Sequence, residues 1–230
     1  MATQIKHGIQ TRQKGMLIYQ LDENDRPIRY QPWLGNAFAF LYDFFMVHSI
    51  FPNKFNASQE RHKIILSEQL QNIHGQHVLE LGTGSGSTTT FLPPDNAYVG
   101  TDVSTGLLKQ AVKRFKQAGF GSPEFYVASG DDLPFADESF DLCLCILSLN
   151  FIGHHKKVFN EVHGLLRSGG NFIACVPVPE RTPKEITIHG NLLSEVRLEK
   201  LCRQTGFIFE PIKAENGALL YFWANKPEKE

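Results

Sequence analysis

The sequence predicts an α/β fold, a doubly wound sheet of mostly parallel strands with helices on both faces. From about residue 75 onward, strand-like runs alternate with helix-like runs, the order typical of strand–helix–strand crossovers. The run at 141–148 is apolar on both faces, as the centre of a parallel sheet requires. The segment 104–118 has one apolar helical face between a capping Ser104 and a terminating Gly119.

The individual elements follow from the same patterns. Seven strands are expected, at 77–81, 97–102, 124–128, 141–148, 171–177, 207–212 and 218–225. Helices are expected at 104–118, 155–166 and 194–205, the last of them ending at Gly206. A helix before the first strand begins near Asn56 or Ser58, which cap well, and buries one stripe formed by Ile65, Leu66, Leu70 and Ile73.

The N-terminal third differs in character, so we expect an N-terminal arm and helical segment over 1–74 and the α/β domain over 75–230. Residues 1–35 are polar, with the turn-like "DENDRP" between "MLIYQL" and "PIRYQ". This stretch is either a hairpin or a loose arm that orders on binding. The aromatic stretch "NAFAFLYDFFMVHSIF" then has the length of a helix.

Composition narrows the class of protein. The 230 residues carry a formal net charge of −1 without a block of like charges, so neither nucleic acid nor an acidic membrane is indicated as a partner. The four cysteines lack zinc-ligand spacing, and we expect buried free thiols, no metal site and a cytoplasmic location. No signal-peptide pattern and no membrane-spanning run is expected. The oligomeric state stays open.

A glycine-rich loop and an acid mark the expected ligand site. Gly82, Gly84 and Gly86 directly follow the first strand, and Asp102 ends the second, 20 residues after Gly82. Ligands of doubly wound sheets bind beyond the carboxyl ends of the strands, where glycines allow close approach and a carboxylate accepts hydrogen bonds from ribose hydroxyls. The pattern predicts a nucleotide-like ligand. The alternative is a tight structural turn with a helix-capping Asp.

The loop departs from the dinucleotide pattern G-x-G-x-x-G, because Ser87 occupies the place of the third glycine and Glu80 precedes the first glycine by two residues. Together with "GTDVSTGLLKQA", "ASGDDLPFADESFDLCL", "NEVHGLLRSGGNFIACVP" and "GALLYFWANKP", it resembles the class I S-adenosylmethionine-dependent methyltransferases of the small-molecule, type 11 (UbiE-like) kind. The resemblance covers roughly 75–225 and implies a Rossmann-like seven-stranded sheet with an antiparallel last strand. The implied cofactor is S-adenosyl-L-methionine.

The resemblance also implies roles for particular residues. Glu80 and the backbone of Gly82, Thr83 and Gly84 would hold the methionine part, and Asp102 the ribose. Leu147 would lie near the sulfonium, and many relatives carry Asp where this chain has Ser129, which leaves adenine recognition to Gly130 and Asp131. The full set of implied cofactor-binding residues is Glu80, Gly82, Thr83, Gly84, Gly86, Asp102, Val103, Leu107, Ser129, Gly130, Asp131 and Leu147.

Alignment of an acceptor with an activated sulfonium methyl needs no obligate base, so the catalytic residues stay unknown. His154 and His155, and less strongly His48, are candidate bases for a phenol or alcohol acceptor, and exposed or core placement is the simpler interpretation of each. "SLNFIG" lacks the two prolines with which some relatives grip a planar amino group, which disfavours adenine or amide nitrogen as acceptor.

Two further segments are candidates for covering the acceptor. The stretch 37–45 is either a lid, as in relatives, or a set of aromatics packed on the sheet. The loop 177–191 is either a mobile cover carrying Arg181 and Lys184 or a solvated loop. The leading hypothesis is methyl transfer to an unidentified small molecule. The alternatives are a non-catalytic regulatory protein that binds the same cofactor, a nicotinamide-dependent oxidoreductase, and methylation of a protein or lipid.

Overall fold

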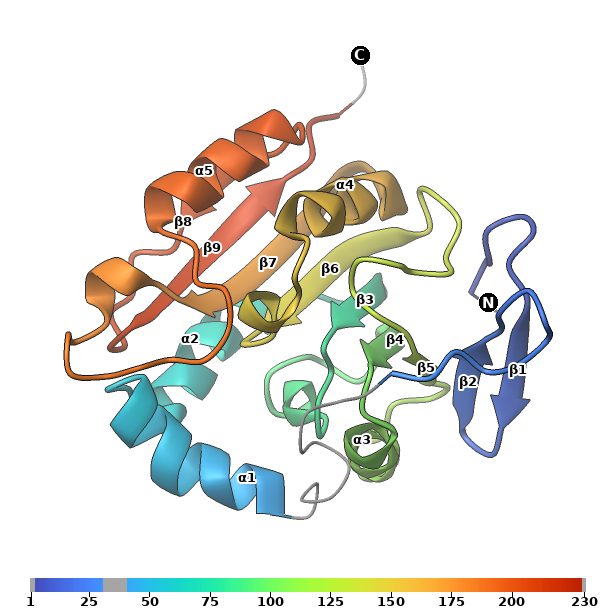
Figure 1. Cartoon of the computed structure of the whole chain (residues 1–230), viewed down its shortest axis with the longest axis horizontal. Coiled ribbons are helices and arrows are strands. Elements are labelled where there is room, and N and C mark those ends of the chain that lie inside the picture. The colour runs from blue at the N-terminus through green and yellow to red at the C-terminus, as the bar shows by residue number, and fades with distance from the viewer. Residues whose placement is uncertain (1–2, 31–40, 229–230) are drawn as a thin grey trace.

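The computed structural model describes residues 3–30 and 41–228. Its nine-stranded sheet has the order β1-β2-β5-β4-β3-β6-β7-β9-β8, and Figure 1 shows it running across the molecule. The strands are β1 Thr11–Lys14, β2 Leu17–Gln20, β3 His77–Leu81, β4 Ala97–Asp102, β5 Glu124–Val127, β6 Phe140–Ile146, β7 Leu166–Pro177, β8 Ile208–Pro211 and β9 Leu219–Asn225.

The seven C-terminal strands confirm the predicted α/β class. β5, β4, β3, β6 and β7 are parallel neighbours, and β9 lies antiparallel between β7 and β8. The central strand β6 is buried along most of its length, as its run of apolar residues predicts. The carboxyl ends of β3, β4 and β6 therefore meet at one edge of the sheet, where the strand order reverses.

The N-terminal hairpin brings the strand number to nine. Its regular ladder pairs 11–14 with 17–20, and β2 then runs parallel to β5 at the sheet edge. The predicted pairing of "MLIYQL" with "PIRYQ" across "DENDRP" is reduced to one bridge, Leu21 with Pro27. Asp22 holds that turn through its carboxylate, which accepts the backbone N–H groups of Asn24 and Arg26 at 2.9 Å each. The stretch does contain a hairpin, but the predicted position of its turn is wrong, because the main turn lies at Gly15 rather than at "DENDRP".

The helices begin where their caps predict. Ser58, Ser104 and Ser194 each accept a backbone N–H at 3.2 Å. The helices are α1 Tyr42–Phe45, α2 Gln59–Leu70, α3 Thr105–Gln117, α4 His155–Leu165 and α5 Glu195–Gln204, with a π-helix at Met46–Lys54 and short 3₁₀ turns at Ser87–Thr90, Leu149–Phe151 and Pro179–Arg181.

Two hydrophobic clusters sandwich the sheet. One contains the apolar faces of α4 and α5, with Val158 and Leu198 fully buried. The other contains those of α2 and α3, with Leu66 and Leu108. Figure 1 shows α4 and α5 side by side over the strands β6 to β9. All four cysteines are free and buried.

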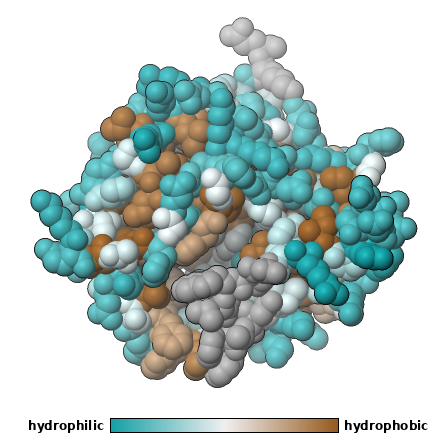
Figure 2. Space-filling model, viewed as in Figure 1, coloured by the Kyte–Doolittle hydropathy of each residue, from teal (hydrophilic) through white to brown (hydrophobic). Residues whose placement is uncertain are grey.

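The surface in Figure 2 is mostly hydrophilic, with small separate apolar areas. Within the described residues, no helix combines the length and the apolar character that crossing a lipid bilayer requires.

Candidate active site

The glycine-rich loop follows β3 in a conformation that favours glycine. Gly82, Gly84 and Gly86 all have left-handed φ values, of 71°, 57° and 86°. A Cβ on Gly82 would lie 2.4 Å from the Cβ of Ser148, and one on Gly86 would lie 2.9 Å from the Cα of Ala111. Close packing against the β6 end and against α3 therefore adds to the backbone requirement. Gly82 and Gly86 therefore allow the loop to pass this close to its neighbours, whereas Gly84 is favoured by its φ alone, with no atom nearer than 4.0 Å to an added Cβ.

Asp102 is joined directly to that loop. Its Oδ2 accepts the Gly84 N–H at 2.9 Å and its Oδ1 accepts the Ser104 N–H at 2.8 Å. Burial raises the pKa of Asp102, and the donors from the Ser104 and Gly84 backbone oppose that shift. The sequence spacing thus does bring the acid and the glycine loop together.

Glu80 lies on the other side of the loop. It is 2% exposed and accepts hydrogen bonds from the Thr88 hydroxyl at 2.6 Å and from the Tyr98 hydroxyl. Burial raises its pKa to about 7, against the opposing effect of both hydroxyls. Tyr98 in turn contacts Thr83 Oγ1 at 3.1 Å. Sequence reasoning missed both residues. Thr88 is one of several hydroxyl residues after the loop, and Tyr98 lies within a strand, so neither position by itself indicates a contact with Glu80.

Leu147 has an unusual backbone at the end of β6. Its φ is 58°, a left-handed value that is uncommon for a branched side chain and frequent at functional sites. The Leu147 N–H donates to the Cys175 carbonyl at 2.8 Å, which holds this conformation. The residue lines the same cavity as Glu80, Gly82, Thr83 and Gly84.

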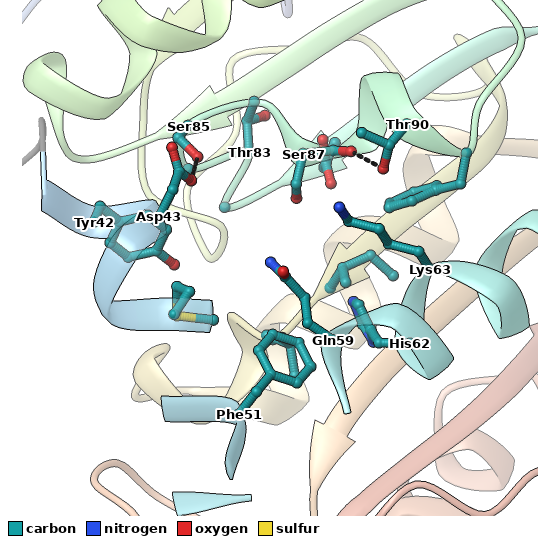
Figure 3. Close-up of a pocket in the computed structure, with 17 residues that line it drawn as sticks. Tyr42, Asp43, Phe51, Gln59, His62, Lys63, Thr83, Ser85, Ser87 and Thr90 are labelled. Atoms are coloured by element: carbon teal, nitrogen blue, oxygen red, sulfur yellow. Dashed lines mark hydrogen bonds between the residues drawn. The ribbon is translucent and has the colours of Figure 1, made fainter. Parts of the chain in front are cut away.

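That cavity lies between the glycine loop, the end of β6, and helices α1 and α2 (Figure 3). The wall from α1 is held by Asp43, which accepts the Ser85 hydroxyl at 2.7 Å and forms an ion pair with Arg114 of α3. The volume of about 50 Å³ is well below the roughly 300–1,000 Å³ of small-molecule pockets. A cavity of this volume is too small for a whole nucleoside.

The residues implied for adenine lie apart from this cavity. Val103 lines a second cavity, of about 840 Å³, between the N-terminal hairpin and the ends of β4 and β5. The Ser129 hydroxyl donates to Asp131 Oδ1 at 2.5 Å, and Gly130 packs so closely on Ile152 that a Cβ would lie 2.7 Å from its Cδ1. Leu107 is buried in the first turn of α3. Unlike Val103, the other residues of this set line neither cavity, namely Leu107, Ser129, Gly130 and Asp131.

The histidines that the sequence suggests as catalytic bases lie outside the cavities, and two of them already contact backbone carbonyl groups. The His155 ring contacts the Leu149 carbonyl at 3.1 Å and is buried, which lowers its pKa. His154 is exposed before α4, and exposed His48 stacks on Phe44 with its Nδ1 3.0 Å from the Phe44 carbonyl. None of the three lines a described cavity. His62, which the sequence analysis passed over, does line the first cavity.

The covering segments are described in part. Residues 37–40 of the expected lid lie outside the described residues. In α1 the rings of Phe44 and Phe45 are 57% and 47% exposed, so these aromatics do not pack on the sheet. In the loop 177–191, Arg181 pairs with Glu195 at 3.3 Å and the Asn150 side chain donates to the His189 carbonyl at 2.9 Å. These contacts tie the loop to α5 and to the β6 end.

The acidic groups around the glycine loop suit the chemistry of S-adenosylmethionine. A buried acid ends β4 where ribose hydroxyls need an acceptor, and a second buried acid, Glu80, borders the glycine loop where an ammonium group would lie. The three left-handed glycines carry no side chain at their own positions, and the small side chains of Thr83 and Ser85 line the cavity between them.

Comparisons with known proteins indicate a family of enzymes. Residues 79–174 match a family model described as a methyltransferase domain. A demethylmenaquinone methyltransferase of Clavibacter sepedonicus is 30% identical over 122 residues, which are 51% of this chain and 49% of that protein. The chain spans half or less of the length of the curated relatives it matches.

Solved structures share the architecture. The YcgJ protein of Bacillus subtilis has a TM-score of 0.62 at 16% identity, covering 73% of this chain and 100% of that one. A Thermotoga maritima protein, described as an S-adenosylmethionine-dependent methyltransferase and possible histamine N-methyltransferase, has a TM-score of 0.60 at 17% identity, covering 84% and 97%. At these identities the likeness shows the fold.

Proposed function

We propose that this chain is a class I S-adenosylmethionine-dependent methyltransferase and that it transfers a methyl group to a small-molecule acceptor by in-line displacement. The methyltransferase-domain match over residues 79–174 supports the proposal. The observation that carries the proposal is the hydrogen bond from the Gly84 N–H to Asp102 Oδ2, at 2.9 Å. It joins the glycine loop to the acid in the arrangement that grips a nucleoside at the carboxyl edge of the sheet. We propose 75–230 as the catalytic domain and 1–74 as its N-terminal arm and lid.

In this proposal the chain's residues bind and orient. Asp102, at the end of β4, would accept hydrogen bonds from the ribose. Glu80 would attract the ammonium group of the methionine end and Leu147 would border the reacting centre, and both line the cavity. S-adenosylmethionine, when bound, supplies an already activated methyl group. The remaining work of the chain is alignment and exclusion of water, which the apolar wall of the cavity favours.

The cavity wall also indicates the class of acceptor. Beside Leu147 it includes Met46, Phe51, Phe91 and Ile146, and such a lining favours a planar or apolar small molecule. The related protein from Clavibacter is named for demethylmenaquinone, a small molecule of that description. We extend only the class to this chain.

The test is calorimetry followed by an assay of turnover. We expect the protein to bind S-adenosylmethionine and S-adenosylhomocysteine, and not NADH. Binding of NADH alone would instead support the oxidoreductase alternative. The protein is then incubated with a metabolite extract and methyl-labelled donor, and label in a small product is the expected result. Donor binding without label in any extract fraction would favour the non-catalytic regulatory alternative.

A further inference from the structure

One face of α2 presents polar groups to the cavity instead of to solvent. Gln59, His62 and Lys63 have the spacing i, i+3, i+4 and share one side of the helix. All three line the glycine-loop cavity. Figure 3 shows the Gln59 amide pointing into the cavity and the Lys63 side chain extending across it, with its ammonium group turned toward Ser87.

Lys63 forms no ion pair with any acid among the described residues. Salt bridges among the described residues involve other cations, and no hydrogen bond of its ammonium group is found in the same part of the chain. It is nevertheless partly buried, and a partly buried ammonium group without an anion is unfavourable. A ligand anion in the cavity would relieve that cost.

The acid in the same cavity is already engaged. Both Glu80 oxygens accept hydrogen bonds from protein hydroxyls, Thr88 on Oε1 and Tyr98 on Oε2. His62 contributes no charge, because burial lowers its pKa to about 3 and its Nδ1 lies 2.9 Å from the Tyr221 hydroxyl. Asp43 also lines the cavity but is paired with Arg114. The remaining charged groups are one cation on α2 and one acid on β3, a pairing suited to a ligand that is itself a zwitterion.

We propose that Lys63, assisted by the Gln59 amide, binds the α-carboxylate at the amino-acid end of the sulfonium donor, opposite Glu80. The proposal rests on the proposed function, and it deepens that function by naming a residue on α2 that selects the zwitterionic end of the donor. Lys63 is a binding residue here and takes no part in moving a proton.

A comparison of two methyl donors can show whether Lys63 binds the carboxylate or contributes to donor binding in another way. S-adenosylmethionine and its decarboxylated form share the sulfonium, the adenosine and an ammonium group, and differ in the carboxylate. Calorimetry should show that the wild-type protein prefers the carboxylated form by about tenfold or more, as expected for a charge-assisted contact. Lys63→Met should lose that preference, with the affinity for decarboxylated S-adenosylmethionine unchanged within about twofold.

Controls keep the outcomes distinct. Lys63→Arg should retain much of the preference, and Arg61→Met, which removes an exposed cation two residues away on the same helix, should retain all of it. An undiminished preference in Lys63→Met overturns the inference, as does an equal loss of affinity for both donors, which would indicate a structural role. If the wild-type protein binds neither donor, the proposed function itself fails.

Discussion

Replacement of Glu80 by Gln should change the pH dependence of stability in a defined direction. The folded chain keeps the Glu80 carboxyl protonated up to a pKa of about 7, against an ordinary value of 4.5. The unfolded chain releases that proton at lower pH, so the free energy of unfolding falls as pH rises from 4.5 to 7. A shift of this size corresponds to about 3 kcal/mol. Gln cannot titrate, so the variant lacks this decline.

The measurement is urea denaturation of both proteins, followed by circular dichroism at several pH values from 4.5 to 8. The stability of wild type relative to Glu80→Gln should fall by about 3 kcal/mol across the window and then level off above pH 7. Comparison at equal pH removes the contribution of other groups. His62 is the important one, because its pKa, lowered from 6.5 to about 3, makes stability decrease as pH falls below 6.5.

A matched control is Glu60→Gln, which removes a carboxyl from the exposed side of α2. It tests whether loss of one negative charge alone produces the effect. A difference between wild type and Glu80→Gln that stays constant with pH, or grows as pH rises, would refute the conclusion that burial raises the pKa of Glu80.

Three further predictions address the loop, the acid and the lid. Asp102→Ala should weaken binding of S-adenosylmethionine and of methylthioadenosine alike, by at least about tenfold in calorimetry, because both ligands contain the ribose. A folded variant that binds both ligands as tightly as wild type would contradict the proposed site. Gly82→Ala should lower the free energy of unfolding by about 1–3 kcal/mol in urea, because its Cβ would meet Ser148. Gly75→Ala, with a similar φ of 65° and nothing within 4 Å, should cost less, and an equal cost would exclude the clash as the cause. Asp43→Asn should speed association of S-adenosylhomocysteine in stopped flow by up to about fivefold, because it weakens a partly exposed ion pair; a slower rate would show that α1 does not close the cavity.

Local patterns were enough to predict the elements of the α/β region. Ser104 caps α3 and Gly119 follows its end at φ 84°, because capping and left-handed turns depend on residues a few positions apart. The strand bounds of β3 and β4 agree with prediction to the residue. The alternation of elements then leaves few topologies open, since crossovers are right-handed and short.

Pairings between distant segments could not be predicted in this way. The polar "DENDRP" reads as the turn of a hairpin, yet the regular ladder forms one turn earlier, where β2 can also pair with β5. That choice depends on a strand more than a hundred residues away. A pattern with period two does not tell a strand which neighbour it will have.

The α/β class, the glycine loop and the acid 20 residues after Gly82 can be predicted from the sequence, because each depends on spacing along the chain. The tertiary structure alone decided that Tyr98 and Thr88 hold Glu80, that Asp43 pairs with Arg114, and that Lys63 faces the loop from α2. Each of these contacts joins different segments of the chain, and spacing along the chain does not say which segments will lie together in space. Only the packing of the helices on the sheet brings the groups within hydrogen-bonding or ion-pair distance.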